Sequence, residues 1–187
     1  MSFIKVKAKR ISNIGKIVPI FFFTLFFLIS LSACNNLPQN NKVEPIIYFL
    51  GDFCISNDGY FIEGTLKNEK GGALNLNITS PEQINGLSFS KTENETLIKF
   101  NDLAMKSTEQ LLPKNSYIPA IFAILDSLKS PNNFNLVSSE DPTSTFIGHC
   151  NKIDFELKVD NASRFIKEIA IPKENVVFSL SDCQEIK

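Results

Sequence analysis

The side chains best suited to catalysis or metal binding stand next to each other, at His149 and Cys150. His149 is the only histidine of the chain, and an imidazole beside a thiol could form a pair of metal ligands or an activated nucleophile. A metal site needs more protein ligands than this local pair supplies. We therefore expect His149 to be a solvent-facing residue of a strand, and we predict no metal site and no cofactor.

Acidic pairs and catalytic motifs provide no stronger candidate. Asp154 and Glu156 stand two residues apart, so on a strand they would point to the same polar face, where contact with solvent explains them sufficiently. The sequence contains no Gly-x-Ser-x-Gly elbow, no His-Glu-x-x-His pair and no phosphate-binding glycine loop. Gly71-Gly72 is typical of a hairpin turn. We predict that the protein has no catalytic residues and is not an enzyme.

The N-terminus has the three parts of a secretory signal peptide. Residues 1–16 carry five basic side chains and no acid, residues 17–31 are almost entirely apolar, and the small pair Ser32-Ala33 follows. The apolar run is shorter than the roughly 20 residues that a membrane-spanning helix needs. We predict a signal peptide over residues 1–33.

The end of this segment, Leu31-Ser32-Ala33-Cys34, resembles a bacterial lipobox. The resemblance implies that the sulfur of Cys34 receives a diacylglyceryl group and that cleavage leaves Cys34 as the mature N-terminus. Two acyl chains hold a protein on a membrane, whereas one chain does so only marginally. The implied location is the extracytoplasmic face of the cell membrane, with residues 34–45 as lipidated cysteine and flexible tether. An uncleaved signal anchor that ends near Cys34 is the alternative.

Removal of the signal peptide would change the charge of the protein. The chain has 19 basic and 20 acidic residues, and since five of the bases and none of the acids precede Cys34, the mature net charge would be about −6. A nucleic-acid partner is usually recognised through a basic patch, as is an anionic membrane surface. We expect no nucleic-acid partner, and contact with the membrane through the lipid anchor alone.

Three cysteines would remain beside the lipidated one, at Cys54, Cys150 and Cys183. Outside the cytoplasm they allow one disulfide and one leftover thiol, or no disulfide, and the three pairings are equal candidates. No Cys-x-x-Cys is present. We favour buried or loosely oxidised thiols.

Residues 46–187 predict a single domain built mainly of short strands. Leu74, Leu76 and Ile78 alternate with polar residues, which places them on one face of a strand. The run Asn57-Asp58-Gly59 predicts a tight hairpin. Further strands are expected over 46–56, 60–67, 86–91, 95–102, 103–107 and 134–138, followed by a meander over 145–160, 165–171 and 176–182.

One amphipathic helix, over residues 115–130, interrupts the strands. Apolar side chains recur there at steps of three and four, at Ile118, Ile121, Phe122, Leu125 and Leu128. Ser116 is the expected N-cap, Pro119 falls in the first turn, and Pro131 ends the helix. We therefore expect a mainly β (α+β) domain, with an antiparallel sheet that is polar on one face and carries the helix on the other.

Several stretches resemble the LolA-like lipoprotein carrier superfamily, and more closely its little-characterised lipoprotein members in bacteria without an outer membrane. They are Thr79-Ser80-Pro81 leading to Gly86-Leu87, the run from 97 to 107 with the helix after it, and the terminal meander. The resemblance spans roughly Ile46 to Asp182. It implies a curved antiparallel sheet forming an incomplete barrel, with the helix packed on its concave face. Carriers of that family are soluble shuttles, whereas Cys34 would tie this chain to a membrane.

The resemblance also implies a ligand, which would be a lipid, an acyl chain or a lipoprotein held between the sheet and the helix. The residues expected to line such a groove are Leu74, Leu76, Ile78, Phe89, Phe100, Ile118, Phe122 and Leu125. The same side chains could instead form a filled core. The protein would then be an interaction or structural module of the cell envelope, with a protein partner that the sequence does not identify.

Overall fold

The computed structural model describes residues 43–93, 95–107 and 117–186, which belong to one compact unit, Lys42–Lys187. The predicted signal peptide, the lipidation site Cys34 and the predicted N-cap Ser116 lie outside the described residues. In the part of the chain that is described, no helix combines the length and the apolar character needed to cross a membrane.

The described residues form an 11-stranded antiparallel sheet and one α-helix, as the strand and helix patterns predict. The strands are β1 (Phe49–Asn57), β2 (Tyr60–Asn68), β3 (Leu74–Ser80), β4 (Ser88–Lys91), β5 (Thr96–Phe100), β6 (Leu103–Ser107), β7 (Phe134–Glu140), β8 (Thr143–Cys150), β9 (Ile153–Asp160), β10 (Ile166–Ile171) and β11 (Val176–Glu185). The helix is α2 (Tyr117–Ser127), and three short 3₁₀ turns, η2 (Glu82–Ile84), η4 (Pro131–Asn133) and η5 (Pro172–Glu174), complete the described elements.

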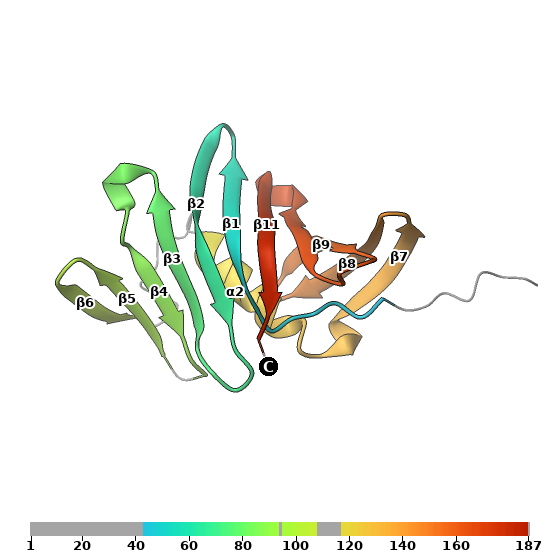
Figure 1. Cartoon of the computed structure of the whole chain (residues 1–187), viewed down its shortest axis with the longest axis horizontal. Coiled ribbons are helices and arrows are strands. Elements are labelled where there is room, and N and C mark those ends of the chain that lie inside the picture. The colour runs from blue at the N-terminus through green and yellow to red at the C-terminus, as the bar shows by residue number, and fades with distance from the viewer. Residues whose placement is uncertain (1–42, 94, 108–116, 187) are drawn as a thin grey trace, which may run out of the picture. The chain divides into compact units, whose positions relative to one another are not determined.

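The sheet consists of two meanders that meet at β1 and β11, which lie side by side in the middle of Figure 1. The order across the sheet is β6-β5-β4-β3-β2-β1-β11-β10-β9-β8-β7. The register of the central pair runs from Asn57 opposite Val176 to Phe49 opposite Glu185. The two edge strands of the described sheet, β6 and β7, are therefore consecutive along the chain, and the connection between them contains α2.

Alternation and turn residues explain the strands that the sequence predicts. In β3, Leu74, Leu76 and Ile78 are buried while Asn77 and Thr79 are exposed. The β1–β2 hairpin turns through Asp58 and Gly59, both with positive φ, which is the geometry that an Asn-Asp-Gly run favours.

The predicted segment 145–160 is divided into two strands, β8 and β9. They are joined by a hairpin turn at Asn151 and Lys152, whose φ angles are 47° and 69°. An Asn-Lys pair is a weaker turn signal than Asn-Gly because lysine has no special tolerance for positive φ. The tertiary pairing of the two strands holds this turn in place.

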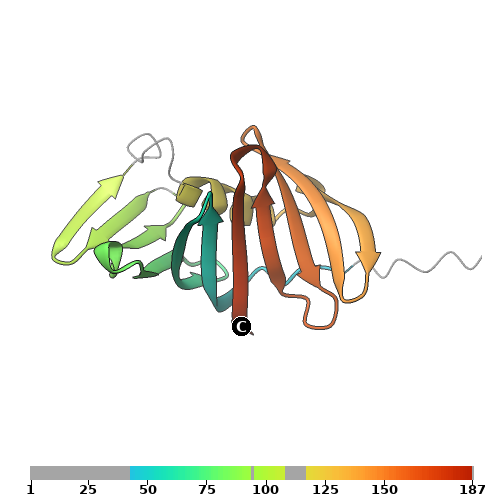
Figure 2. The ribbon, with the colours of Figure 1, turned by 90° about the horizontal axis from the view of Figure 1, so that it is seen from above.

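The helix packs on one face of the sheet through the apolar stripe that its spacing predicts. Its buried side chains, Ile118, Ile121, Phe122, Ile124 and Leu125, belong to the same hydrophobic core as the buried residues of the strands. Figure 2 shows α2 running along one side of the central strands. The described helix ends at Ser127, before the predicted end at Ser130, because turns of the 3₁₀ type follow, from Lys129 to Asp126 and from Ser130 to Ser127.

The chain joins the core before the first strand begins. Val43 and Ile47 pack against the core, and the backbone N–H of Ile46 donates to the carbonyl oxygen of Arg164 at 2.9 Å. The buried side chain of Asn68 donates from Nδ2 to the carbonyl oxygen of Ile47 at 2.7 Å. These contacts hold Val43, Ile46 and Ile47 against the sheet, so the chain joins the domain at Val43, within the predicted tether of residues 34–45.

Two glycines allow phenylalanine rings to lie directly over the backbone of the neighbouring strand. Phe53 is paired with Gly64, and Phe155 is paired with Gly148. A Cβ on Gly64 would lie 2.0 Å from the carbonyl oxygen of Asn77 and 2.8 Å from the ring of Phe53. These positions therefore require glycine for close packing rather than for a special backbone angle.

We expect Gly64→Ala to lower the free energy of unfolding by about 1–3 kcal/mol, because the added methyl group overpacks a site closed by backbone atoms. Urea denaturation measures the difference. The matched comparison is Gly72→Ala in the exposed turn before β3, where the new Cβ would lie 2.9 Å from the Cβ of Glu69 and would meet no other residue as closely; because the turn is exposed and can adjust, this variant should lose less stability than Gly64→Ala. Equal stability of the two variants would contradict this account of the packing.

Candidate functional site

On the core face of the sheet, the described side chains become more exposed toward the β6 edge. The strand registers align Leu76, Phe89, Ile98 and Met105 in one row across β3, β4, β5 and β6. Residues directly opposite each other in antiparallel strands share a face, so all four belong to the core side. Leu76 and Phe89 are buried, Ile98 is half-buried, and Met105 is 51% exposed.

A second apolar pair continues this surface at the β5–β6 hairpin. Phe100 is paired with Leu103 across the turn, where Asn101 has a positive φ of 52°. Phe100 is half-buried and Leu103 is 75% exposed. Together Ile98, Phe100, Leu103 and Met105 form what we call the open apolar face.

The size of α2 explains why this part of the sheet is open. A helix of 11 residues is about 16 Å long, whereas 11 strands extend over roughly 48 Å at about 4.8 Å per spacing. One such helix therefore covers only part of the sheet. In Figures 1 and 2, β5 and β6 extend beyond α2.

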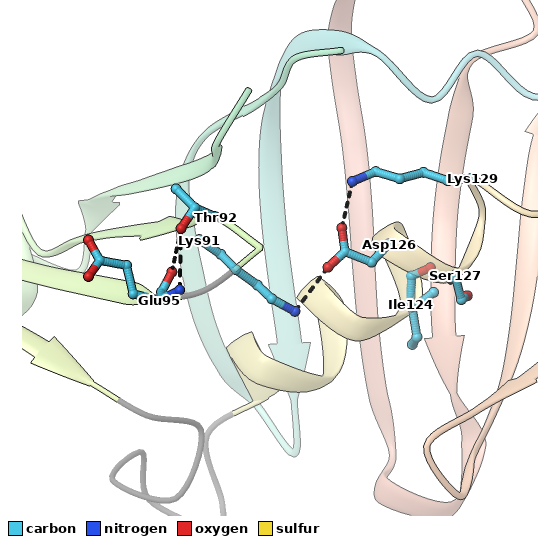
Figure 3. A network of polar contacts seen from close by, with 7 residues as sticks. All are labelled: Lys91, Thr92, Glu95, Ile124, Asp126, Ser127 and Lys129. Atoms are coloured by element: carbon cyan, nitrogen blue, oxygen red, sulfur yellow. Dashed lines mark hydrogen bonds and ion pairs between the residues drawn. The ribbon is translucent and has the colours of Figure 1, made fainter. Parts of the chain in front are cut away.

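An ion-pair network ties the end of α2 to the strand next to the open apolar face. Lys91 of β4 reaches Asp126 of the helix, with Nζ and Oδ2 2.9 Å apart, and Lys129 binds the other oxygen of Asp126 at 2.8 Å (Figure 3). Lys91 pairs with Leu74 and Thr96 and so lies on the core side of the sheet, where its side chain is only 18% exposed. The network therefore stands at the boundary between covered and open sheet.

The environment of Asp126 favours its charged form. Partial burial acts to raise its pKa, but the hydrogen bonds from Lys129 and Lys91 outweigh that effect and hold the pKa below its ordinary value. The carboxylate of Asp126 is thus charged at neutral pH.

Seven of the eight residues predicted to line a groove lie in the hydrophobic core: Leu74, Leu76, Ile78, Phe89, Ile118, Phe122 and Leu125. Their burial is what both a filled core and a slot closed by the helix require, so the groove stays a prediction. The eighth, Phe100, belongs to the open apolar face. Sequence reasoning missed its neighbours Ile98, Leu103 and Met105, although a hairpin at Asn101-Asp102 would have aligned them with Phe100.

His149 has the exposed strand position that the sequence predicts, and it takes part in a polar cluster. Its Nδ1 lies 2.7 Å from Oδ1 of Asp154, which faces it across β8 and β9, and Lys173 binds the other oxygen of Asp154. The hydrogen bonds from Lys173 and then from His149 lower the pKa of Asp154. The cluster borders a shallow hollow of about 550 Å³. The described residues contain no group of three or more side chains able to hold a metal ion.

The three cysteines of the described domain are free thiols. Burial raises the pKa of Cys54, Cys150 and Cys183. A raised pKa keeps a thiol protonated at neutral pH and makes it a poor nucleophile. This agrees with the interpretation of these residues as partly buried thiols.

Comparison with known proteins bears on the fold alone. No protein-family model matches the chain, and no curated protein is similar to it. An uncharacterised conserved protein from Thermus thermophilus has a similar structure, with a TM-score of 0.50, 9% identity and coverage of 74% of this chain and 78% of that chain.

Two further structures match at lower scores. A LolA superfamily protein from Nitrosomonas europaea has a TM-score of 0.41 and 10% identity, over 76% of this chain and 88% of that one. A chain from the structure of the Clostridioides difficile CwlD amidase in complex with the GerS lipoprotein has a TM-score of 0.41 and 13% identity, over 97% of both chains. Scores below 0.5 do not establish a common fold, so of these three structures the Thermus protein is the one that supports the architecture.

We expect Asp126→Asn to lower the midpoint of thermal unfolding at pH 7, by an amount equivalent to less than about 1 kcal/mol because Asp126 is partly exposed. The pKa of Asp126 is depressed in the folded state, so the stabilisation is complete above the unfolded-state pKa near 4 and is lost as the pH falls through the lower folded-state pKa. Thermal scans from pH 7 to pH 2.5 should therefore show the difference between wild type and variant shrinking below pH 4.

The control for this prediction is Glu69→Gln, which removes the partner of the exposed Lys67. It should change the midpoint less than Asp126→Asn does. A difference for Asp126→Asn that persists unchanged at pH 2.5 would show that packing, and not charge, is responsible.

Proposed function

We propose that the protein is a membrane-anchored extracytoplasmic lipoprotein that binds an acyl chain, as a lipid or as part of a lipoprotein, on the open apolar face and in a groove that continues from it beneath α2. The observation that carries the proposal is the exposure of Leu103 and Met105 on the core side of the sheet. Met105 continues the row of the buried residues Leu76 and Phe89. Contiguous apolar side chains left in water are typical of a binding surface.

The chemistry of this surface suits a hydrocarbon chain. The four side chains of the open apolar face are an isoleucine, a phenylalanine, a leucine and a methionine, without an acid or base among them. Covering them would stabilise a complex by about 25 cal/mol per Å² of apolar surface removed from water. A flexible methionine adapts well to ligands of variable shape.

We also propose that the sheet curves as an incomplete barrel with α2 on its concave side. The edges β6 and β7 of the described sheet are not paired with each other, and the helix and the open apolar face belong to the same side. A ligand on that side would have the end of α2, held by Lys91 and Asp126, as one wall. The ion pair would then limit how deep an acyl chain reaches.

Anchoring through Cys34 would restrict where such a ligand is exchanged. Eight residues separate Cys34 from Val43, the first described residue, and a fully extended chain of that length reaches about 28 Å. A domain on so short a tether works close to its own membrane. It would receive, hold or present a lipid locally rather than carry one across the envelope.

The second candidate is an interaction or structural module of the envelope that binds no lipid and performs no catalysis. Seven of the eight predicted groove residues are buried, which a filled core requires as much as a closed slot does, and a filled core would leave no room for a lipid. In that case the exposed side chains of β6 would contact a protein. The two candidates differ in whether a lipid is bound.

Anchoring predicts that Cys34→Ala abolishes both lipid attachment and cleavage, because the thiol is the acceptor of the diacylglyceryl group. Expressed in a bacterium fed a radiolabelled fatty acid, the wild-type chain should carry label and lose residues 1–33, whereas the variant should remain unlabelled and retain them. Cys54→Ala is the control and should be labelled like wild type. Label on the Cys34→Ala chain, or its absence from the wild type, would refute this anchor.

Ligand binding predicts a co-purifying lipid mass in native mass spectrometry of residues 35–187 isolated from bacteria without detergent. Leu103→Glu together with Met105→Glu should remove that mass, because two carboxylates would be buried against hydrocarbon. The domain should still fold, since both side chains are largely exposed.

Val137→Glu is the matched control, because Val137 is also exposed, on β7 at the opposite edge, and this variant should keep the lipid. A wild-type domain that stays free of lipid even after incubation with phospholipids and lipopeptides would favour the interaction module. Lipid retained by the double variant would exclude the open apolar face as the site.

A further inference from the structure

Strand β6 presents an unprotected edge of the described sheet. It pairs with β5 along Leu103–Ser107 and has no strand on its other side among the described elements. The backbone groups along such an edge are available to another strand, and native proteins usually block them with bulges, prolines or several charges. In β6 the residues are Leu103, Ala104, Met105, Lys106 and Ser107, with a single charge.

The opposite edge, β7, shows how this fold protects a strand that stays unpaired. Its register against β8 shifts between Leu136 and Ser138, which is a bulge, and it ends in Ser138-Ser139-Glu140. A bulge and a terminal acid disfavour pairing with another chain. Strand β6 has no bulge and pairs regularly with β5 over its whole length. Its outer edge is therefore suited to pairing with another strand.

We propose that β6 pairs antiparallel with β6 of a second copy of this chain, around a twofold axis that is perpendicular to the sheet and passes midway between Ala104 and Ala104 of the other copy. This register places Leu103 opposite Met105 of the other copy, and Met105 opposite its Leu103, on the apolar side. On the polar side it places Asp102 of each copy opposite Lys106 of the other, which gives two pairs of opposite charge. The strand is thus complementary to itself in both shape and charge.

Neighbouring registers lack this complementarity. A twofold axis at Met105 would oppose Leu103 to Ser107, and an axis at Leu103 would oppose Met105 to Asn101 and Phe100 to Lys106. Lys106 forms an ion pair with Glu95 of its own chain, with Nζ and Oε2 2.9 Å apart, and its side chain is 73% exposed, so its ammonium group can be shared with Asp102 of the other copy. Each alternative register puts apolar side chains opposite polar ones, so the axis at Ala104 is favoured.

Pairing of this kind would join the two open apolar faces into one continuous surface on the same side of a doubled sheet. The inference rests on the edge and the side chains of β6 and not on the presence of a lipid. Association and lipid binding are measured separately, so either can fail without the other.

A cysteine at the twofold axis tests the pairing directly. In the full chain, in membranes of the bacterium that expresses it, Ala104→Cys would face its own copy. Directly opposed antiparallel residues have Cα atoms about 4.5–5.5 Å apart, which a disulfide can span. Oxidation with copper phenanthroline should produce a covalent dimer on a non-reducing gel, at least about fivefold above the wild-type background from the native, partly buried cysteines.

The matched control is Lys99→Cys. Lys99 is paired with Ala104 from β5 and points to the same side, but it lies one strand further from the edge. The two copies of this cysteine would be about 15 Å apart, given strand spacings near 4.8 Å, and should not crosslink above background. Equal crosslinking by the two variants would mean random collision in the membrane and would overturn the proposal, as would no dimer from Ala104→Cys.

Charge exchange tests the register. In the Ala104→Cys chain, Lys106→Asp would oppose an acid to Asp102 of the other copy twice, and should reduce the dimer about fivefold. Adding Asp102→Lys restores opposite charges and should restore the dimer. Failure of this rescue would exclude the Ala104 register, and a crosslink to a different protein in place of the homodimer would overturn the second copy as the occupant of the edge.

Discussion

The pairing of β1 with β11 is the interaction on which the rest of the domain depends. Each meander alone has one apolar face and would leave most of it in water. Joined through Phe53 opposite Leu180 and Ile55 opposite Phe178, the two halves form a single core side. The stacked rings of Phe53 and Phe178, with centroids 5.4 Å apart, lie at this junction. The joined sheet provides the surface on which Ile118, Ile121, Phe122, Ile124 and Leu125 of α2 are buried.

The same pairing dictates the course of α2. Because it brings the beginning and the end of the domain to the centre, the middle of the chain must travel from one edge of the sheet to the other. An apolar helix on the core face makes this crossing while burying side chains along the way. The helix is short, however, and the Lys91–Asp126 ion pair ties its end to β4. Among the described residues, therefore, none of the helix covers strands β5 and β6, as a consequence of topology and length.

The proposed function and the proposed dimer both arise from this uncovered end. Its side chains contact a ligand through the face of the sheet, whereas a second copy would bind through the backbone edge. The face and the edge of the sheet point in perpendicular directions, so a ligand on the face leaves the edge accessible to a second copy. A tether close to a membrane would raise the local concentration of copies in two dimensions, which favours weak pairing of short strands.

Much of this protein is determined by local sequence. The alternation of Leu74, Leu76 and Ile78, the turn at Asp58-Gly59 and the stripe from Ile118 to Leu128 depend on neighbours a few residues away, and each predicts its element correctly. The resemblance to a lipobox at Cys34 is a local pattern too, and it stays a prediction. Likewise, the exposed position of His149 follows from its place on a strand.

Tertiary structure alone decided which of these apolar residues are covered. Leu103 and Leu76 follow the same strand periodicity and share the core side, yet one is 75% exposed and the other is fully buried. Alternation specifies the face of the sheet on which a side chain lies, but not whether another element covers that face. The cover depends on the long-range pairing of β1 with β11 and on the length of α2. The position of Lys91 on the apolar side has the same origin, because only the folded helix supplies Asp126 as its partner.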